Sequence, residues 1–414
     1  MSNIKYKNQF FASCPSGMEQ YLKNELKSIG VKEMELTTGG VHFECFPELA
    51  IQAILHSRVA SRIYKKLYGF EIKTEKDLYY QMKDIKWKAI FDLEQSFKIQ
   101  ILQGKSPDGK KRSKFKNAMY LGQVCKDGIV DRFRKDTGNR PDVDKEYPDA
   151  PLLIRVEPNN NPHSQKENVT VSLDLCGKAL SFRGYRRLSV EAPLRENLAA
   201  GMVLKSGLKA DEDLYNPMCG SGTILIEALM IKAAIPPSFL KVREYHQFES
   251  KEWAFLEQKF FTKDKYLVEN TKKFFKEVAD KASQGIQKLE KSKSKNVACD
   301  LDERSLKSAK SNLDTAGLSS FVELLKDDAT ELEIPSFKGK VLVNPPYGER
   351  LKQDELEGLY REFGERLKNS FKNSEAYILT ANFEMIKKIQ LKTAERMIVY
   401  NGNLESRLVR YNLY

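Results

Sequence analysis

The pattern of apolar and polar positions changes near residue 187 of the 414-residue chain. Beyond it, short apolar runs alternate with stretches of helical spacing, which is typical of a parallel α/β sheet. The runs predict strands at residues 213–217, 296–300, 321–327, 340–345, 374–381, 395–401 and 406–414. The stretches between them predict helices at residues 223–234, 266–289, 303–316 and 354–368 and near Phe383. Because no helix separates the last two strands, we expect them to form an antiparallel hairpin at one edge.

Before residue 187 the pattern predicts two smaller α+β units. Residues 10–68 predict strand, helix, strand and helix, and the second helix extends over residues 47–64. The next unit predicts strands at residues 97–103, 151–158 and 168–177 and one helix at residues 118–136. We therefore expect three domains, at residues 1–69, 70–180 and 181–414, which suits a chain of this length.

The positive charge lies in the first half of the chain. The 69 basic and 57 acidic side chains give a net charge of +12. Residues 1–190 hold 33 of the basic and 23 of the acidic side chains, so the second half is nearly neutral. The densest basic run, at residues 98–116, indicates either a solvated loop or, as we favour, a loop that contacts the phosphates of a nucleic acid. Its predicted contacts are Lys105, Lys110, Lys111, Arg112 and Lys114.

Composition excludes several classes of protein. With 41% hydrophobic and 30% charged residues, the chain is of a folded, water-soluble type. No stretch approaches the ~20 apolar residues of a membrane span, and the N-terminus lacks the apolar run of a signal peptide, so we expect a cytoplasmic protein. The six cysteines and four histidines show no ligand spacing, so neither a disulfide framework nor a metal site is predicted.

Candidate chemistry follows the predicted strands at their carboxyl ends, where an open α/β sheet binds its ligand. Gly220 and Gly222 form a turn between the strand at 213–217 and the next helix. Glycines let the backbone approach a ligand, and the helix N-terminus offers unpaired N–H groups. The turn lacks the third glycine of a dinucleotide fingerprint and the Gly-Lys-Ser/Thr of a phosphate loop, so neither of these sites is favoured.

Acidic residues follow the next two strands. Asp300 ends the second strand and is placed to accept hydrogen bonds from both hydroxyls of a ribose. Asp302 suits a ligand contact and an N-cap of the following helix equally well. Asp327 and Asp328 end the third strand, where they could accept from an adenine amino group or where one of them could cap a turn.

The fourth strand ends in Asn344-Pro345-Pro346-Tyr347. Because the two prolines stop the strand and fix the backbone, the Asn344 side-chain oxygen and the Pro345 carbonyl can both accept from one exocyclic amine. Tyr347 offers a ring for stacking a base, which contributes about 1–3 kcal/mol. An amine that attacks a sulfonium methyl group chiefly needs positioning and desolvation. The four strand ends together therefore predict a methyltransferase.

These motifs resemble those of the Rossmann-fold, S-adenosylmethionine-dependent amino-methyltransferases with an Asn-Pro-Pro-Tyr signature. Residues 181–187 (SFRGYRR), 192–204 (APLRENLAAGMVL) and 348–351 (GERL) are similar to segments of bacterial ribosomal RNA guanine-N2 methyltransferases that carry an RNA-binding THUMP domain. The resemblance covers nearly the whole chain. It implies an α/β, class I methyltransferase domain with a mixed seven-stranded sheet, preceded by α+β ferredoxin-like and THUMP domains. The implied reaction is methylation of the N2 amine of a guanine in 23S ribosomal RNA, on an assembly precursor of the large subunit.

The resemblance also implies roles for individual residues. S-adenosyl-L-methionine would be contacted by Asn216, Cys219, Gly220, Ser221, Gly222, Asp300 and Asp328. The guanine would be bound by Asn344, Pro345, Pro346 and Tyr347. Residues 193–198 would lie over the cofactor. RNA phosphates could be clamped by Arg183, Arg186 and Arg187, or these arginines could pair with acids across the domain junction.

One position departs from the family pattern, because Asn216 stands where the family usually has Asp. An amide keeps the hydrogen-bonding shape but loses a negative charge near a cationic cofactor, so lower affinity is expected unless Asp211 or Asp213 compensates. Two other functions stay open. One is an adenine-N6 methyltransferase acting on DNA or RNA, since the same turn also serves adenine. The other is a catalytically idle RNA-binding assembly factor.

Overall fold

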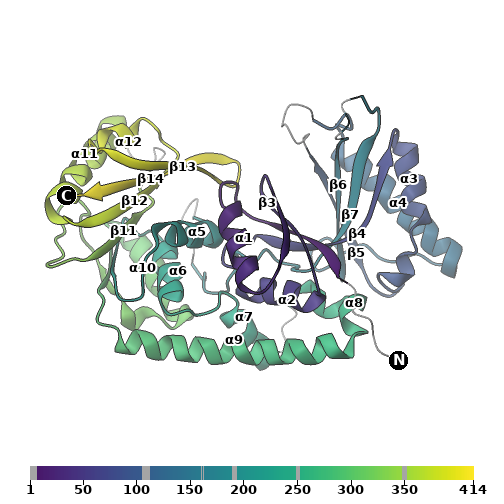
Figure 1. Cartoon of the computed structure of the whole chain (residues 1–414), viewed down its shortest axis with the longest axis horizontal. Helices are drawn as coiled ribbons and strands as arrows, with labels where there is room; N and C mark the ends of the chain where they lie inside the picture. The colour runs from purple at the N-terminus through teal and green to yellow at the C-terminus, as the bar shows by residue number, and fades with distance from the viewer. Residues whose placement is uncertain are drawn as a thin grey trace.

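The computed structural model arranges the chain along one long axis (Figure 1). It describes residues 7–104, 112–159, 161, 163–188, 194–248, 252–346 and 352–414. The C-terminal α/β part lies at one end, residues 62–174 form the other end, and the first strands and helices lie between them. Two sheets therefore organise the molecule, one for each half of the chain.

The first sheet runs without a break through both of the smaller units. Its strands are β1 (Asn8–Ser13), β2 (Glu33–Thr37), β3 (Gly40–Cys45), β4 (Arg62–Ile72), β5 (Phe97–Gln103), β6 (Ala150–Pro158) and β7 (Glu167–Asp174). Their order is β2-β3-β1-β4-β7-β6-β5. The first residues of β4 pair with β1, and almost its whole length pairs with β7. The boundary expected between residues 69 and 70 thus falls inside a strand that both units share.

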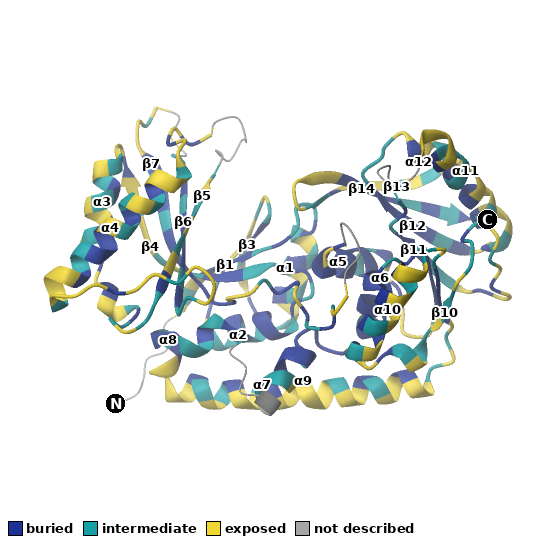
Figure 2. Ribbon diagram, turned by 180° about the vertical axis from the view of Figure 1, so that it is seen from behind, coloured by how far each residue is buried: buried dark blue, intermediate teal, exposed yellow. Residues whose placement is uncertain are grey.

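The helices of this half correct part of the sequence prediction. They are α1 (Glu19–Ser28), α2 (Pro47–His56), α3 (Glu75–Asp84), the short 3-10 turn η1 (Trp87–Ala89) and α4 (Ala118–Thr137). The helix predicted at 118–136 is confirmed as α4, which lies beside α3 on the outer face of the sheet (Figures 1 and 2). The helix predicted at 47–64 is wrong in its second part, because α2 ends at His56 and Arg62 already begins β4.

The second sheet contains seven strands of mixed direction, as predicted. They are β8 (Asp213–Pro217), β9 (Asn296–Cys299), β10 (Glu323–Leu325), β11 (Gly339–Val343), β12 (Ser374–Thr380), β13 (Thr393–Asn401) and β14 (Leu404–Leu413). Their order is β10-β9-β8-β11-β12-β14-β13. β8 to β12 are parallel, while β14 runs antiparallel to both β12 and β13. The predicted hairpin at the edge of the sheet is confirmed.

Helices connect these strands. They are α5 (Glu196–Ser206), α6 (Thr223–Lys232), α7 (Phe239–Phe248), η2 (Ala254–Glu257), α8 (Lys259–Thr262), α9 (Lys265–Lys291), α10 (Glu303–Ala316), η3 (Ser319–Phe321), α11 (Gln353–Ser370) and α12 (Met385–Lys388). The predicted helices correspond to α6, α9, α10, α11 and α12. The sequence pattern missed α5 and α7, which lie between the end of the first sheet and β9 in the chain.

The long helix α9 braces the molecule along its lower edge in Figure 1. It contacts α2 of the N-terminal unit as well as α7 and α8. On its inner side the ring of Phe275 packs against Trp253, with 5.3 Å between the ring centroids, and against Tyr245 at 5.0 Å. Its other face is exposed along the length of the helix (Figure 2). α9 therefore ties the α/β part to the N-terminal unit through one continuous element.

Buried arginines close the junction between these two parts. The Arg58 guanidinium donates to the carbonyl oxygens of Ile235, at 2.7 Å, and Met230, at 3.3 Å. Arg183 donates in turn to the Arg58 carbonyl and lies 3.3 Å from a carboxylate oxygen of Glu227. Because main-chain acceptors fix these side chains, the junction has one defined geometry rather than a sliding contact.

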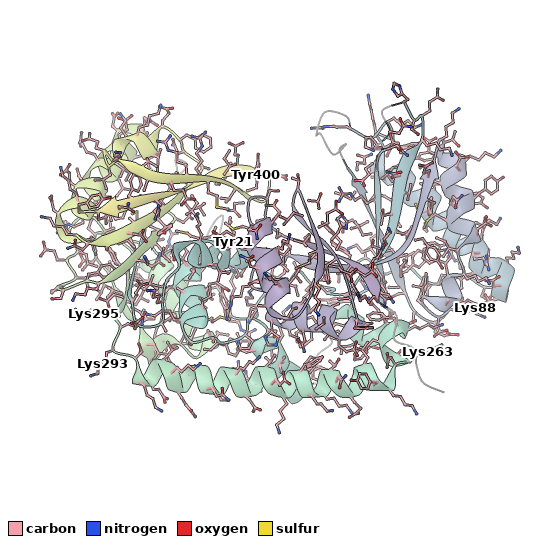
Figure 3. All side chains as sticks on the ribbon, viewed as in Figure 1. Tyr21, Lys88, Lys263, Lys293, Lys295 and Tyr400 are labelled. Carbon is pink, nitrogen blue, oxygen red and sulfur yellow. The ribbon has the colours of Figure 1, made fainter. Side chains whose placement is uncertain are left out.

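The edge hairpin also reaches the N-terminal unit. The Tyr400 N–H in β13 donates to the Ser16 carbonyl, just before α1, at 3.2 Å (Tyr400 is labelled in Figure 3). One hydrophobic cluster extends from Phe10 in β1 to Leu408 in β14. Among the described residues no helix is both long and apolar enough to cross a membrane.

Candidate active site

The predicted site residues gather at the carboxyl ends of β8, β9, β10 and β11. β8 is the first strand of this sheet in the chain, and β9 and β10 lie on one side of it, whereas β11 and β12 lie on the other side. The strand order therefore reverses beside β8. Open α/β sheets bind ligands at such a switch point, because the two flanking loops diverge and leave a crevice. The sheet topology thus brings together four motifs that are as many as 130 residues apart in the sequence, from Asn216 to Pro346.

The glycine turn after β8 is tied to β9. The N–H of Gly220 donates to Oδ2 of Asp300 at 2.9 Å, and the N–H of Cys219 donates to the carbonyl of Cys299 at 3.0 Å. Gly220 has φ +56° and Met218 φ +51°, a region that favours glycine and strains other residues. A Cβ on Gly220 would meet nothing within 4 Å. The backbone of this turn therefore borders open space.

Ser221 and Gly222 shape the turn from the protein side. Gly222 has φ +76°, and a Cβ on it would lie 3.2 Å from the Cβ of Ala309 on α10. The Ser221 hydroxyl is 3.2 Å from the Thr223 hydroxyl and is buried. Gly222 is thus required by close packing, and open space lies beside Gly220. Contacts of Ser221 and Gly222 with the cofactor stay predictions.

Asn216 joins the ends of β8 and β11. It is 1% exposed, and its Nδ2 donates to the Leu342 carbonyl at 2.7 Å. Its Oδ1 is buried without a hydrogen-bond partner among the described residues. Asp213 lies at the opposite end of β8, where its carboxylate accepts from the N–H groups of Lys295 and Lys338, at 2.8 and 2.9 Å. It is therefore engaged elsewhere and does not supply the charge that Asn216 lacks.

Asp300 and Asp302 have different roles. Besides the Gly220 N–H, Asp300 accepts the N–H of Asp302 at 3.0 Å. Asp302 caps α10 by accepting the N–H of Arg304 at 3.1 Å, which is the capping alternative considered for it. Leu301, between the two acids, is 62% exposed and was overlooked in the sequence. The sequence pattern that could have identified Leu301 is an apolar residue directly after the acid that ends a strand.

The acids after β10 hold a turn. Oδ1 of Asp328 accepts from the N–H and the hydroxyl of Thr330, at 2.8 and 2.7 Å, and Oδ1 of Asp327 accepts the N–H of Asp328 at 2.8 Å. Asp328 thus caps a turn with one of its carboxylate oxygens. A contact of its other oxygen with adenine stays a prediction.

The residues Asn344, Pro345 and Pro346 directly follow β11. Pro345 is buried, and Asn344 and Pro346 are half-buried. The Pro346 carbonyl accepts a hydrogen bond from the Tyr360 hydroxyl on α11 at 3.2 Å. Tyr347 lies outside the described residues. The turn stands beside Asn216, whose amide holds the strand that leads into it.

Comparison with known proteins identifies the family. A family model described as an RMKL-like methyltransferase domain matches residues 183–410, more than half of the chain. The chain belongs to this methyltransferase family. Models of an RlmL ferredoxin-like domain and a THUMP domain match residues 9–64 and 73–161. The predicted fold, a class I methyltransferase domain preceded by ferredoxin-like and THUMP domains, is confirmed.

Individual relatives agree with this assignment. The ribosomal RNA large subunit methyltransferase K/L of Photobacterium profundum is 34% identical over 407 residues, or 98% of this chain and 53% of the relative. The chain thus spans about half the length of that relative. The solved structure of SMU.472 complexed with SAH has a TM-score of 0.78 and 26% identity, over 99% of each chain. A predicted N6-adenine-specific DNA methylase from Listeria monocytogenes str. 4b F2365 has a TM-score of 0.77 and 25% identity, over 99% of this chain and 97% of the other.

Two arginines expected at the RNA are instead held inside the methyltransferase domain. Arg183 is 3% exposed beside Glu227, as described above. Arg186 donates to Glu196 at 2.8 Å and to the Thr223 hydroxyl at 3.1 Å, at the start of α6. Their guanidinium groups are therefore bound to acceptors of the protein, which favours pairing with acids over the predicted phosphate contacts, with both acids inside the methyltransferase domain and not across the domain junction. Arg186 supports the glycine turn.

The predicted RNA loop of the THUMP domain is described only in part. Lys105, Lys110 and Lys111 lie outside the described residues. Arg112 and Lys114 are exposed. The main-chain N–H of Lys114 donates to the buried carboxylate of Glu167 at 2.6 Å, which fixes the end of the loop against β7. Contacts of these five side chains with RNA stay predictions.

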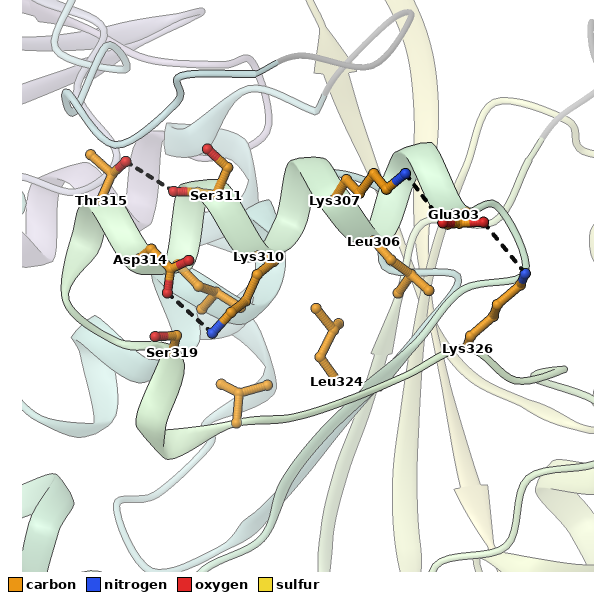
Figure 4. Close-up of a pocket in the computed structure, with 12 residues that line it drawn as sticks. Glu303, Leu306, Lys307, Lys310, Ser311, Asp314, Thr315, Ser319, Leu324 and Lys326 are labelled. Atoms are coloured by element: carbon orange, nitrogen blue, oxygen red, sulfur yellow. Dashed lines mark hydrogen bonds and ion pairs between the residues drawn. The ribbon is translucent and has the colours of Figure 1, made fainter.

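An open cavity of about 820 Å³ lies between α10 and β10 of the methyltransferase domain (Figure 4). Its basic side chains are paired, Lys307 and Lys326 with Glu303 and Lys310 with Asp314. None of the residues predicted to bind cofactor or base lines it. Among the described residues no three histidines, cysteines or acids are grouped to hold a metal ion. The switch point of the sheet therefore stays the candidate active site.

Proposed function

We propose that this methyltransferase transfers a methyl group from S-adenosyl-L-methionine to the exocyclic N2 amine of a guanine in large-subunit ribosomal RNA. The observation that carries the proposal is the meeting of the glycine turn, Asp300 and the Asn344-Pro345-Pro346 turn at one switch point. The name of the Photobacterium relative supports ribosomal RNA as the substrate. The finer target, a position resembling guanine-2445, rests on the sequence resemblance alone.

The residues at the switch point fit a nucleoside cofactor. Open space borders Gly220, and Asp300 provides a carboxylate for ribose hydroxyls. The exposed side chain of Leu301 can pack on the face of an adenine ring. Oδ1 of Asn216 is buried and has no hydrogen-bond partner in the part of the chain that the structure describes. It suits the amino group of the methionine part, because an unsatisfied buried acceptor favours a donor strongly. When bound, this cofactor supplies an electrophilic methyl group on a sulfonium centre.

Asn344 and Pro345 would bind and orient the target amine. The Asn344 side-chain oxygen and the Pro345 carbonyl each accept one N–H of the amine, so that its lone pair points at the methyl group. The amine nitrogen would form the new N–C bond as the C–S bond of the bound cofactor breaks, and the proton that the nitrogen then loses would pass to bulk solvent after the transfer. Because the aromatic amine is neutral before the attack, the protein need not supply a strong base. Its contribution is orientation and the exclusion of water.

The distribution of charge agrees with an RNA-binding first half and a catalytic second half. The half of the chain with the ferredoxin-like and THUMP domains carries the positive excess, which can hold phosphates. The methyltransferase half is nearly neutral and need admit only one base that has left its stack. RNA binding and catalysis would therefore depend on different parts of the protein.

Adenine N6 is the alternative target. Any exocyclic amine with two N–H bonds can donate to the same two acceptors, and the similar Listeria protein is described as an adenine-specific methylase. A catalytically idle RNA-binding factor is the second alternative, which a calorimetric titration without any binding of S-adenosyl-L-methionine would support.

The test is to incubate the protein with tritiated S-adenosyl-L-methionine and unmodified ribosomal RNA, then to separate the nucleosides. We expect label in N2-methylguanosine. An Asn344→Ala variant should transfer methyl groups about 100-fold more slowly, because one of the two acceptors that orient the amine is lost. Asn403→Ala, in the exposed turn between β13 and β14, is the control and should be unaffected. Label in N6-methyladenosine, or an equal rate for Asn344→Ala, would contradict the proposal.

A further inference from the structure

The two prolines leave little conformational freedom in the turn that would bind the target amine. Asn344 and Pro345 each precede a proline, which restricts their ψ angles to extended values. The proline rings fix φ of Pro345 and Pro346 at about −65°. Beyond Asn344, the remaining soft dihedral of this stretch is ψ of Pro346. That angle sets the direction of the Pro346 carbonyl and of the chain leading to Tyr347.

A buried chain of hydroxyl groups holds this carbonyl. Tyr360 on α11 is 1% exposed, and its Oη lies 3.2 Å from the Pro346 carbonyl oxygen and 3.3 Å from Oγ1 of Thr380, at the end of β12. Oγ1 of Thr380, itself 1% exposed, accepts the N–H of Asn382 at 3.0 Å.

The direction of each hydrogen bond in this chain follows from its two ends. A carbonyl can only accept, so Tyr360 donates to Pro346, and its oxygen is left to accept from Thr380. Thr380 accepts from a main-chain N–H, which can only donate. Along this chain each hydroxyl therefore donates to one neighbour and accepts from the other, and main-chain groups stand at both ends of the chain as described. Chains of this kind polarise one another and hold their members in one orientation.

The other side of the turn is anchored from the neighbouring strand. Asn216 holds the carbonyl of Leu342, two residues before Asn344, and Tyr360 holds that of Pro346, two residues after it. Both anchoring side chains are 1% exposed. Since β11 is fixed on its strand side, the hydroxyl of Tyr360 controls the remaining freedom of the turn.

We propose that Tyr360 is a positioning residue for methyl transfer. Its hydroxyl, oriented by Thr380, fixes the Pro346 carbonyl, so that Asn344 and Pro345 are held against the target amine between two anchored carbonyls, those of Leu342 and Pro346. The proposal rests on the function proposed above, because it concerns the same turn. Because Tyr360 acts on the turn through the Pro346 carbonyl, we expect its loss to slow the transfer step without weakening the binding of the cofactor.

A Tyr360→Phe variant tests this role, because it removes one oxygen atom and keeps the ring. The matched control is Tyr411→Phe: Tyr411 is also 1% exposed, belongs to the same hydrophobic cluster, and donates to the carbonyl of Ile386 at 3.5 Å, away from the turn. The measurement is the rate of methyl transfer in a single turnover, with enzyme in excess over RNA and cofactor saturating. Calorimetry gives the affinity for S-adenosyl-L-methionine.

We expect Tyr360→Phe to lower the single-turnover rate about 10-fold, since small misplacements of a reacting group are costly, and to leave the cofactor Kd within about twofold of the wild type. Tyr411→Phe should keep the wild-type rate. A Tyr360→Phe rate within about twofold of the wild type, or an equal loss in Tyr411→Phe, would overturn the proposal.

Thr380 provides an independent pair of variants. Thr380→Val keeps the shape but removes the hydroxyl that orients Tyr360, and should also slow the transfer, whereas Thr380→Ser keeps the hydroxyl and should restore it. Equal rates for the two variants would count against the chain of hydrogen bonds. If the labelled nucleoside is not N2-methylguanosine, the proposed target fails, but the ratio of variant to wild-type rates still decides the role of Tyr360.

Discussion

Replacing Arg183 by methionine should destabilise the protein strongly, although this residue lies in a segment that could have been taken for an RNA contact. The substitution removes the guanidinium that faces the Glu227 carboxylate at 3.3 Å, while the methionine fills a similar volume. Arg183 is 3% exposed and Glu227 is fully buried. The variant therefore leaves a buried carboxylate without its nearest cation.

The expected magnitude follows from this burial. Removing one partner of a buried ion pair costs about 3–5 kcal/mol of the free energy of unfolding, because the other charge stays desolvated. The carbonyls of Leu180 and Arg58 also lose their donor. Arg187→Met is the matched control, since Arg187 is 59% exposed and 3.4 Å from Glu244. An exposed pair of this kind contributes about 0–1 kcal/mol.

The dependence on pH provides a second readout. Burial already raises the pKa of the Glu227 carboxyl, and loss of Arg183 should raise this pKa further. A carboxyl with a higher pKa in the folded than in the unfolded state binds protons more tightly when folded, so its contribution to stability falls as pH rises. The deficit of Arg183→Met relative to Arg187→Met should thus be larger at about pH 8 than at about pH 5.

Urea unfolding of both variants at several pH values measures these differences. RNA affinity under native conditions should be the same for Arg183→Met and the wild type. The reasoning is refuted if Arg183→Met is as stable as Arg187→Met, or if its deficit is independent of pH. A selective loss of RNA affinity without loss of stability would return Arg183 to the RNA-binding surface.

Three further predictions concern ligands. Asp300→Ala should raise the Kd of S-adenosyl-L-methionine roughly 10- to 100-fold in calorimetry, since hydrogen bonds to a charged group contribute about 1.5–3 kcal/mol each. Asp302→Ala should instead leave this Kd unchanged and cost about 1 kcal/mol of stability in urea, as an N-cap does, and equal effects on Kd would contradict the division of roles. Gly220→Ala should abolish cofactor binding while costing only about 1–2 kcal/mol of stability, and normal binding would show that the open space beside the turn is not the cofactor site. Raising salt from about 50 to 200 mM should weaken RNA binding on the order of 10-fold for two or three phosphate contacts but barely change cofactor binding, and equal sensitivity would count against separate RNA-binding and catalytic halves.

The methyltransferase half could be predicted well because its central strands β8, β9 and β12 are almost fully buried and read as short apolar runs. The strand at 213–217 and the helix at 303–316 match β8 and α10 at both ends. The first half was harder. β4 contains an irregularity between Lys66 and Tyr68 that breaks the alternation of a strand, and Ile63 and Tyr64 prolonged the helical pattern of α2.

In the candidate site, the motifs that are local in the sequence could be predicted, whereas the contacts between distant residues could not. The glycine turn and the two prolines are sequence-local, so their positions could be predicted. A capping box of Thr74 and Asp77 at the start of α3 was equally readable but was not used. The partners of buried polar groups were not readable, because Asn216 meets the carbonyl of a residue 126 positions away, and the sequence pattern around α11 gives no sign of what the Tyr360 hydroxyl binds.

The brace formed by α9 has a consequence for the choice of target. Its 27 residues span about 40 Å at ~1.5 Å per residue, and it is packed against both the N-terminal unit and the methyltransferase domain. Together with the shared hydrophobic cluster, it keeps the spacing between the THUMP domain and the Asn344 turn constant. If the proposed function holds, an RNA would have to bring a guanine to a set distance from the phosphates bound by the THUMP domain. The enzyme would then select its target by length, and one base pair inserted between the bound phosphates and the target would place the wrong nucleotide at the turn.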